Sequence, residues 1–174
     1  MKLRVFAIIA MLAIAAMFGV KPCAAQKRDP STPEERGRAV NLTRFLEADP
    51  LNEKAPEARR WLMAWLGVVP DISVPVCQDF LKPLMQKDTN YSTELFAQSL
   101  YGSATFIIEH PDDANNYEAM YLAGVESTLR AYEFILKTKP KAKWPFLDEL
   151  IEKRERGELD DYVREVLSKG KCKK

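Results

Sequence analysis

The residue types that most often carry catalytic chemistry are scarce in this sequence. Histidine occurs once, as His110, and there is no Cys-x-x-Cys pair. A zinc site built from histidines and a Glu-x-x-His di-iron centre are therefore excluded, since each needs several such ligands. His110 precedes Pro111 at the expected end of a helix, where an imidazole ordinarily interacts with the terminal carbonyl groups. Glycine-rich phosphate loops and the Gly-x-Ser-x-Gly motif are also absent from the sequence. We predict neither a metal nor a cofactor.

Carboxylate pairs are the catalytic arrangement that the composition leaves open, because two acids alone can hydrolyse a glycosidic bond. Glu126 and Glu133 lie seven residues apart on one helical stripe, and each is followed one turn later by a basic residue. Such acid-first pairs are typical of a solvated helix surface. Glu109 and Glu118 remain as acids that could point inward. A hydrolase that uses a carboxylate pair is therefore kept as an alternative function.

Tyrosine and tryptophan side chains are a more informative group, because they are numerous for this length. Five of them could line a groove for a peptide, a sugar or an apolar ligand. The alternative is that they fill the core, with their polar tips at the surface. We expect a helix around 53–66 and a long helix around 113–139 to form the walls of the groove. The candidate groove residues are Trp61, Trp65, Tyr117, Tyr121 and Tyr132.

The N-terminal segment has the pattern of a signal peptide. A short basic stretch precedes an uninterrupted run of apolar or small residues from Val5 to Val20. Small residues then lead to a predicted cleavage site between Ala25 and Gln26. We therefore expect residues 1–25 to be removed and the mature chain to be periplasmic or secreted, with no stable membrane insertion. The alternatives are an uncleaved N-terminal anchor and a lipoprotein acylated at Cys23.

The expected mature chain is nearly neutral, which bears on its partners. Of the 26 Lys and Arg residues, three lie before position 26, so 23 remain against 25 Asp and Glu. There is no basic surplus to release counterions from a nucleic acid, so we predict no nucleic-acid partner. The basic cluster at 169–174 is predicted to be a solvated tail.

The mature chain would retain two cysteines, Cys77 and Cys172. In an exported protein such a pair is a candidate disulfide. It would close a loop of about 95 residues and stabilise the fold by about 4 kcal/mol in the chain-entropy model. Two unpaired thiols are the alternative.

The elements that must position these residues are predicted to be helices. With 7 Gly, 11 Pro and no sustained period-two alternation, the sequence indicates one all-α domain over 32–168, after a linker at 26–31. The helix around 113–139 is apolar over most of its circumference, so it should pack against several neighbours as a central helix. Gly102 in the preceding helix suggests a close approach near Gly124. About seven helices are expected, at 33–48, 53–66, 74–85, 91–109, 113–139, 145–156 and 159–168.

The helices are expected to pack as antiparallel hairpins around the central one. Three helix–proline–helix turns, at Pro50, Pro111 and Pro140, are separated by 61 and 29 residues. The stretch 45–52 resembles the turn that joins tetratricopeptide repeats, over about eight residues. The small and aromatic residues that this family places in the next helix are absent, and a repeat array needs a nearly constant period. We therefore assign no family and expect solenoid-like packing at most.

The leading functional hypothesis is an exported, non-enzymatic helical module with an aromatic-lined groove for a protein or peptide partner. The alternatives are the carboxylate-pair hydrolase and a carrier of an apolar small molecule. They make different structural demands. A carrier needs an enclosed apolar cavity of roughly several hundred Å³, a hydrolase needs two converging acids, and a binding module needs an exposed apolar surface.

Overall fold

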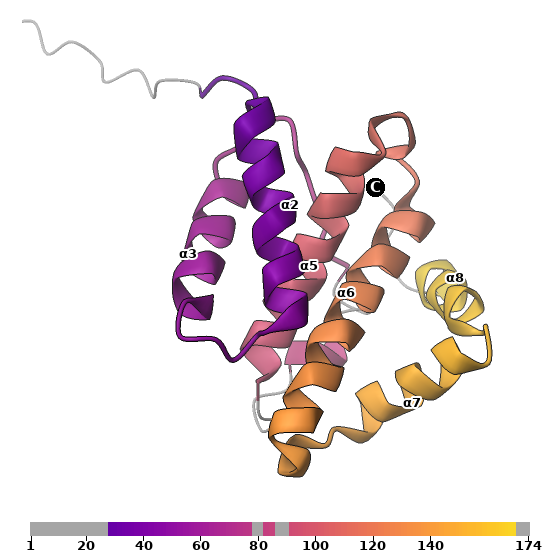
Figure 1. Ribbon diagram of the computed structural model, residues 1–174. Coiled ribbons are helices and arrows are strands. Elements are labelled where there is room, and N and C mark those ends of the chain that lie inside the picture. The colour runs from indigo at the N-terminus through magenta and orange to yellow at the C-terminus, as the bar shows by residue number, and fades with distance from the viewer. Residues whose placement is uncertain (1–27, 78–81, 86–90, 170–174) are drawn as a thin grey trace, which may run out of the picture.

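The protein is built from α-helices throughout the part of the chain that the structure describes, residues 28–77, 82–85 and 91–169. This computed structural model contains six α-helices and three short 3-10 helices within those ranges, and no strand. The all-α prediction is confirmed, with six α-helices in these ranges against about seven expected. The predicted signal peptide, its cleavage site and the tail beyond residue 169 lie outside the described residues. The elements in Figure 1 are α2 (Pro33–Ala48), α3 (Ala55–Leu66), η1 (Lys82–Met85), α5 (Ser92–Glu109), η2 (Pro111–Asp113), α6 (Tyr117–Thr138), η3 (Pro140–Ala142), α7 (Pro145–Glu155) and α8 (Leu159–Lys169).

The start of α2 follows the local sequence signal. The Thr32 hydroxyl accepts a hydrogen bond from the Glu35 backbone N–H at 3.2 Å, and the Glu35 carboxylate accepts one from the Thr32 N–H at 3.1 Å. Together these two bonds form a capping box, and Pro33 occupies the first turn, where its missing N–H costs nothing. The helix ends at Ala48, as the Asp49-Pro50 pair predicts.

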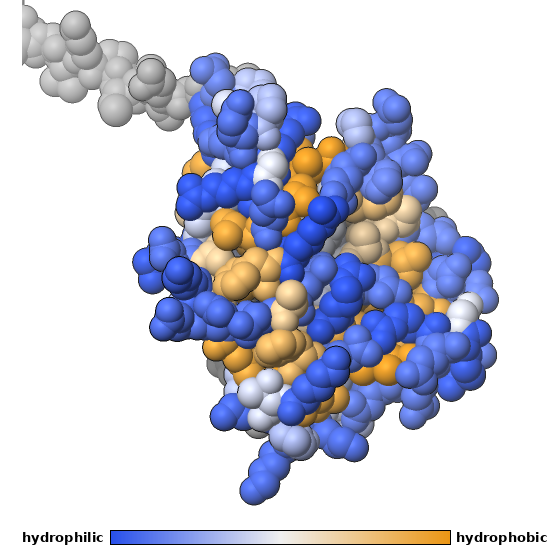
Figure 2. Space-filling view, in the orientation of Figure 1, coloured by the Kyte–Doolittle hydropathy of each residue, from blue (hydrophilic) through white to orange (hydrophobic). Residues whose placement is uncertain are grey.

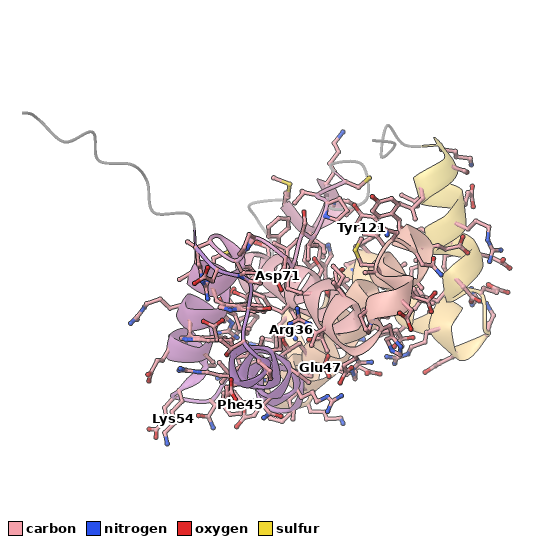
Figure 3. All side chains as sticks on the ribbon, turned by 90° about the horizontal axis from the view of Figure 1, so that it is seen from above. Arg36, Phe45, Glu47, Lys54, Asp71 and Tyr121 are labelled. Carbon is pink, nitrogen blue, oxygen red and sulfur yellow. The ribbon has the colours of Figure 1, made fainter. Side chains whose placement is uncertain are left out.

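Asp71 ties the loop after α3 to the start of α2 (Figure 3). Its carboxylate accepts hydrogen bonds from the Ser31 backbone N–H, the Ser31 hydroxyl and the Arg36 guanidinium, each at 2.7 Å. Partial burial alone would raise the pKa of Asp71. The two Ser31 donors and Arg36 outweigh that effect and hold the pKa at about 2. Residue 31 at the end of the expected linker is therefore anchored.

Helix α3 begins later than predicted. The expected cap, Asn52, accepts a hydrogen bond at its side-chain oxygen from the Lys54 N–H at 3.0 Å. This bond closes a turn ahead of the helix, so α3 begins at Ala55 with no side-chain cap. Pro56 lies in its first turn and Gly67 follows its last residue, as expected.

Helix α6 also begins later than predicted, at Tyr117 instead of near 113. Pro111 to Asp113 form a separate 3-10 turn, η2, so Asp112 does not cap the long helix. The cap is Asn116, whose side-chain oxygen accepts a hydrogen bond from the Ala119 N–H at 3.2 Å. The helix then continues to Thr138, close to the predicted end.

The predicted helix at 74–85 is wrong where the structure describes it. Residues 74–77 are not helical and 82–85 form the 3-10 helix η1, while 78–81 lie outside the described residues. Pro75 disfavours a helical conformation for Val74. The Pro75 carbonyl instead accepts a hydrogen bond from the Tyr121 hydroxyl at 2.6 Å. An irregular segment with Ile72 and Cys77 buried therefore packs against α6.

Helices α5 and α6 form the most extensive helix pair of the fold and lie side by side (Figure 1). A Cβ atom built on Gly102 would lie 2.4 Å from the Ser127 Cβ, and one built on Gly124 would lie 2.6 Å from the Ser99 carbonyl oxygen. Both glycines therefore permit an approach that any side chain would block. The predicted close approach near these two residues is confirmed.

A buried polar seam accompanies this close approach. The Gln98 amide donates to the Ser127 hydroxyl at 2.8 Å and to the Thr43 carbonyl at 3.3 Å. The Ser103 hydroxyl donates to the Met120 carbonyl at 3.1 Å. These buried groups are hydrogen-bonded, as a stable interior requires.

The C-terminal helices α7 and α8 both contact α6, which also contacts α2 and α5. Between α7 and α8 the chain turns at Gly157, whose φ of 71° lies in the left-handed region. The Glu158 N–H donates to the Lys153 carbonyl at 2.8 Å, which is the long hydrogen bond of a Schellman motif. The predicted stop at Gly157 is thus confirmed by local geometry.

Candidate functional site

A surface groove of about 290 Å³ lies between α2 and α3. Its lining combines apolar side chains with charged residues. In Figure 2, hydrophobic residues show on the face between these two helices, with polar side chains on either side. The lining residues are Arg38, Leu42, Phe45, Lys54, Glu57, Ala58 and Trp61.

Helical spacing explains why these residues share one groove. Arg38, Leu42 and Phe45 are at positions i, i+4 and i+7 of α2, so they form one stripe along the helix. Ala58 and Trp61 lie three residues apart on α3. The short connection after Ala48 places Phe45 and Lys54 at the closed end of this hairpin, and Figure 3 shows both residues on the same side of the molecule.

Trp61 lines the groove together with the aromatic side chain of Phe45, and two neighbours hold Trp61 in place. Its ring stacks on Trp65, with the centroids 5.8 Å apart and the planes 9° from parallel. The Arg38 guanidinium carbon lies 4.3 Å from the Trp61 ring centroid, within the range of a cation–π interaction. Trp65 itself is 4% exposed and belongs to the core. The predicted pair thus divides into one groove residue and one core residue.

The three predicted tyrosines lie elsewhere, on α6. Tyr132 is buried, and its hydroxyl donates to Asp148 at 2.8 Å and accepts from the Trp144 N–H at 2.6 Å. Burial raises the pKa of Tyr132, so its hydroxyl stays protonated as a structural donor. Tyr121 is buried and bonded to Pro75, and Tyr117 is partly buried. Figure 3 shows Tyr121 on the far side of the helices from Phe45.

The five predicted residues therefore do not line one common groove, and α6 is not a wall of the groove that Trp61 lines. The wall opposite α3 is α2. Sequence reasoning did not single out Arg38, Leu42 or Phe45 as groove residues. The buried residues of α2 are Ala39, Val40, Thr43 and Leu46. Leu42 and Phe45 form a second apolar stripe beside them, and this second stripe was a usable signal in the sequence.

Every acid that the sequence singled out is held by an arginine. Glu126 lies 3.6 Å from Arg130 in the predicted pair, whereas Glu133 pairs with Arg154 of α7 instead of the expected Lys137. Glu109 pairs with Arg44 and Glu118 with Arg164. These carboxylates join helices at the surface and do not converge on a cleft. The carboxylate-pair hydrolase therefore finds no support among them.

A bidentate ion pair joins α2 to α6. Arg130 donates two parallel hydrogen bonds of 2.9 Å to the two oxygens of Glu47. This bond to Glu47 is the main cause that raises the pKa of Arg130. Glu126 also lies 3.7 Å from Arg154, so the pairs connect α2, α6 and α7 in one network. The polar stripe of α6 thus serves to hold neighbouring helices.

A small, partly open pocket among η1, α5, α6, α7 and α8 has a volume of only about 10 Å³. That space holds at most one water molecule, whereas a small-molecule site occupies roughly 300–1,000 Å³. The carrier hypothesis therefore gains nothing from this pocket. A second surface concavity, of about 370 Å³, includes the exposed residues Met63 and Val76.

The remaining candidates have structural roles. His110 follows α5, is exposed, and packs its ring 4.8 Å from that of Phe106. Cys77 is buried and disulfide-bonded. Cys172 lies outside the described residues, so the Cys77–Cys172 pairing stays a prediction. Within the described ranges no cluster of His, Cys, Asp and Glu could hold a metal ion.

Comparison of this chain with protein families, curated proteins and solved structures gives no match. Among the helices in the described part of the chain, none combines the length and apolarity that a membrane crossing requires. The function must therefore be argued from the groove itself.

Proposed function

We propose that this chain is a non-enzymatic binding module that holds an apolar segment of a protein partner in the α2–α3 groove. The observation that carries the proposal is the apolar floor of Leu42, Phe45 and Trp61, open to solvent and bordered by charged side chains. Partly exposed aromatic residues in a pocket are the residues that most often dominate binding energy at protein interfaces. A volume of about 290 Å³ suits one or two large side chains of a partner.

Export of the chain belongs to the same proposal. The basic start, the apolar run from Val5 to Val20 and the small residues before Gln26 support a cleaved signal peptide. The disulfide at Cys77 fits an oxidising compartment such as the periplasm or the extracellular space. Mass spectrometry of the chain from an envelope fraction should give an N-terminus at Gln26. An N-terminus at Met1 would instead favour the anchored alternative.

The architecture that supports the groove can also be proposed in finer detail. Contacts of α6 with four other helices support its role as the central helix of the fold. The pairs α2–α3 and α5–α6 would then be antiparallel hairpins, whereas α8 crosses α7 (Figure 1). The uneven spacing of their connecting turns limits any likeness to a solenoid to local packing.

Site-specific photocrosslinking tests the proposal in the source cells. p-Benzoylphenylalanine at position 45 lies in the groove, and the same residue at position 134 is a matched control on α6. Both native residues are partly buried phenylalanines. We expect a discrete crosslinked protein from position 45 and not from position 134. Crosslinking from position 45 should be lost when Trp61→Ala is added.

The result that would contradict the proposal is equal crosslinking from both positions, or a product that survives Trp61→Ala. Trp61 is the better residue to replace than Trp65. Truncation of the buried Trp65 would cost about 3–5 kcal/mol of folding stability and would confuse lost binding with lost structure.

A further inference from the structure

We infer that the segment held in the α2–α3 groove is an amphipathic helix whose apolar residues are flanked by two acidic residues about two turns apart. The inference rests on the proposed function and specifies the chemistry of the partner. It is carried by the charges that border the groove.

Arg38 is one of three arginines of the described residues that form no ion pair with a carboxylate, and of these three it is the one that lines the groove. Its only interaction there is with the ring of Trp61. Arg59 and Arg60 also form no ion pair, but Arg59 donates to the Pro50 carbonyl and Arg60 does not line the groove. The arginines that do form ion pairs are Arg28, Arg36, Arg44, Arg130, Arg154, Arg156 and Arg164.

The contact with Trp61 leaves Arg38 ready to bind an anion. A cation–π contact uses the face of the guanidinium and leaves the N–H donors at its edge available. A carboxylate matches two of those donors at once, and such bidentate hydrogen bonds are about twice as strong as neutral ones. Because Trp61 already restrains the guanidinium at 4.3 Å, less conformational entropy is lost when a carboxylate binds.

A second cation lies at the other end of the groove. Lys54 immediately precedes α3, and no ion pair of Lys54 occurs among the residues that the structure describes. Arg38 contacts Trp61, which follows Lys54 by seven residues. On α2, Phe45 at the closed end of the hairpin follows Arg38 by seven residues. Seven residues of helix span about 10 Å, so the two cations lie about two turns apart. Glu57 lies between them along α3 and disfavours a third acid in the middle of the partner segment.

A helix meets these demands with a simple pattern. Acids at positions i and i+7 would reach the two cations, and apolar residues at i+3 and i+4 would enter the groove between them. An extended segment would cover the same distance in about three residues. The groove is formed by two helices, and the described residues contain no strand edge that an extended peptide could join.

Selection from a library of random peptides of about 16 residues, roughly four helical turns, tests the inference. The mature chain serves as bait, and peptides that also bind Phe45→Ala are discarded, so that the remaining peptides depend on the groove. We expect these peptides to be enriched in Asp or Glu at two positions seven apart, with apolar residues between. Replacing either acid by its amide should weaken binding about tenfold, as expected for loss of a charge-assisted hydrogen bond.

Charge reversal identifies the residue responsible. Selection against Arg38→Glu should favour Lys or Arg at one of the two acidic positions, whereas Arg60→Glu, with the same change in charge, should leave the pattern unchanged. If the reversed charge in Arg38→Glu perturbs folding, Arg38→Gln serves as the second variant. It should remove the preference for an acid at that peptide position. Groove-dependent peptides without acidic enrichment, or with acids about three residues apart, would overturn the inference and leave the proposed function intact. No enrichment of groove-dependent peptides would overturn both.

Discussion

Alanine at Gly102 or Gly124 should force α5 and α6 apart. At Gly102 the new Cβ would lie 2.4 Å from the Ser127 Cβ, whereas carbon atoms in contact are separated by about 3.5–4.0 Å. Relieving that overlap requires a shift of at least about 1 Å between packed helices. Overpacking of this kind costs about 1–3 kcal/mol or more, against a gain of up to about 1 kcal/mol in helix propensity. We expect a net loss of roughly 0–2 kcal/mol or more at either position, instead of the gain that helix propensity alone would give.

Gly37 provides the matched control, because it lies within α2 and a Cβ there would have no atom within 4 Å. Gly37→Ala should therefore stabilise the chain by about 0.5–1 kcal/mol. Urea unfolding followed by circular dichroism gives the three free energies on one scale. In a domain of this size, each kcal/mol corresponds to a change in Tm of about 2–4 °C. If Gly102→Ala and Gly124→Ala were as stabilising as Gly37→Ala, the close packing of α5 and α6 would be refuted.

Three further variants test contacts between elements. Asp71→Asn should cost about 1–2 kcal/mol at pH 7, after allowance for partial solvent exposure. Because the folded pKa of Asp71 lies below its ordinary 3.8, this stabilisation should be lost as the pH falls toward about 2. Acid unfolding of the native chain and of the Asp71→Asn variant would show the loss. Tyr132→Phe should cost about 1–3 kcal/mol, since the buried Trp144 N–H loses its acceptor; an unchanged urea midpoint would argue against that bond. Arg130→Gln should lower the free energy of unfolding by about 0.5–1 kcal/mol at low ionic strength and by less at about 1 M salt. A difference that does not depend on salt would contradict the ion pair with Glu47.

Helix ends that depend on neighbouring residues alone could be predicted from the sequence. Thr32 and Glu35 form their capping box within one turn of chain, and Gly157 ends α7 through bonds to the residues just before it. The start of α6 was harder, because Asp112, Asp113, Asn115 and Asn116 are all good cap residues and lie close together. Which one caps depends on the 3-10 turn at 111–113, so local preference alone does not decide.

The segment after Pro70 and the groove could not be predicted in the same way, because both depend on contacts between distant residues. The irregular path at 74–77 is held by Tyr121, which lies 46 residues after Pro75. Likewise, the sequence predicts a helix at 33–48 but does not show which of its apolar side chains border a groove. The way α3 packs on α2 leaves Leu42 and Phe45 at the edge of the helix contact. Helical periodicity in the sequence does not show how two helices pack on each other, so it could not predict this.

The two parts of the molecule should tolerate divergence differently. Between α5 and α6, Ser99, Gly102, Ser103, Gly124 and Ser127 leave no room for larger side chains. Distant relatives should therefore retain small residues at these positions, with the two glycines 22 residues apart. The groove residues Leu42 and Phe45 are subject to no such steric limit. A lineage that changed partner could thus replace them freely, while the α5–α6 spacing would persist as the trace of common ancestry.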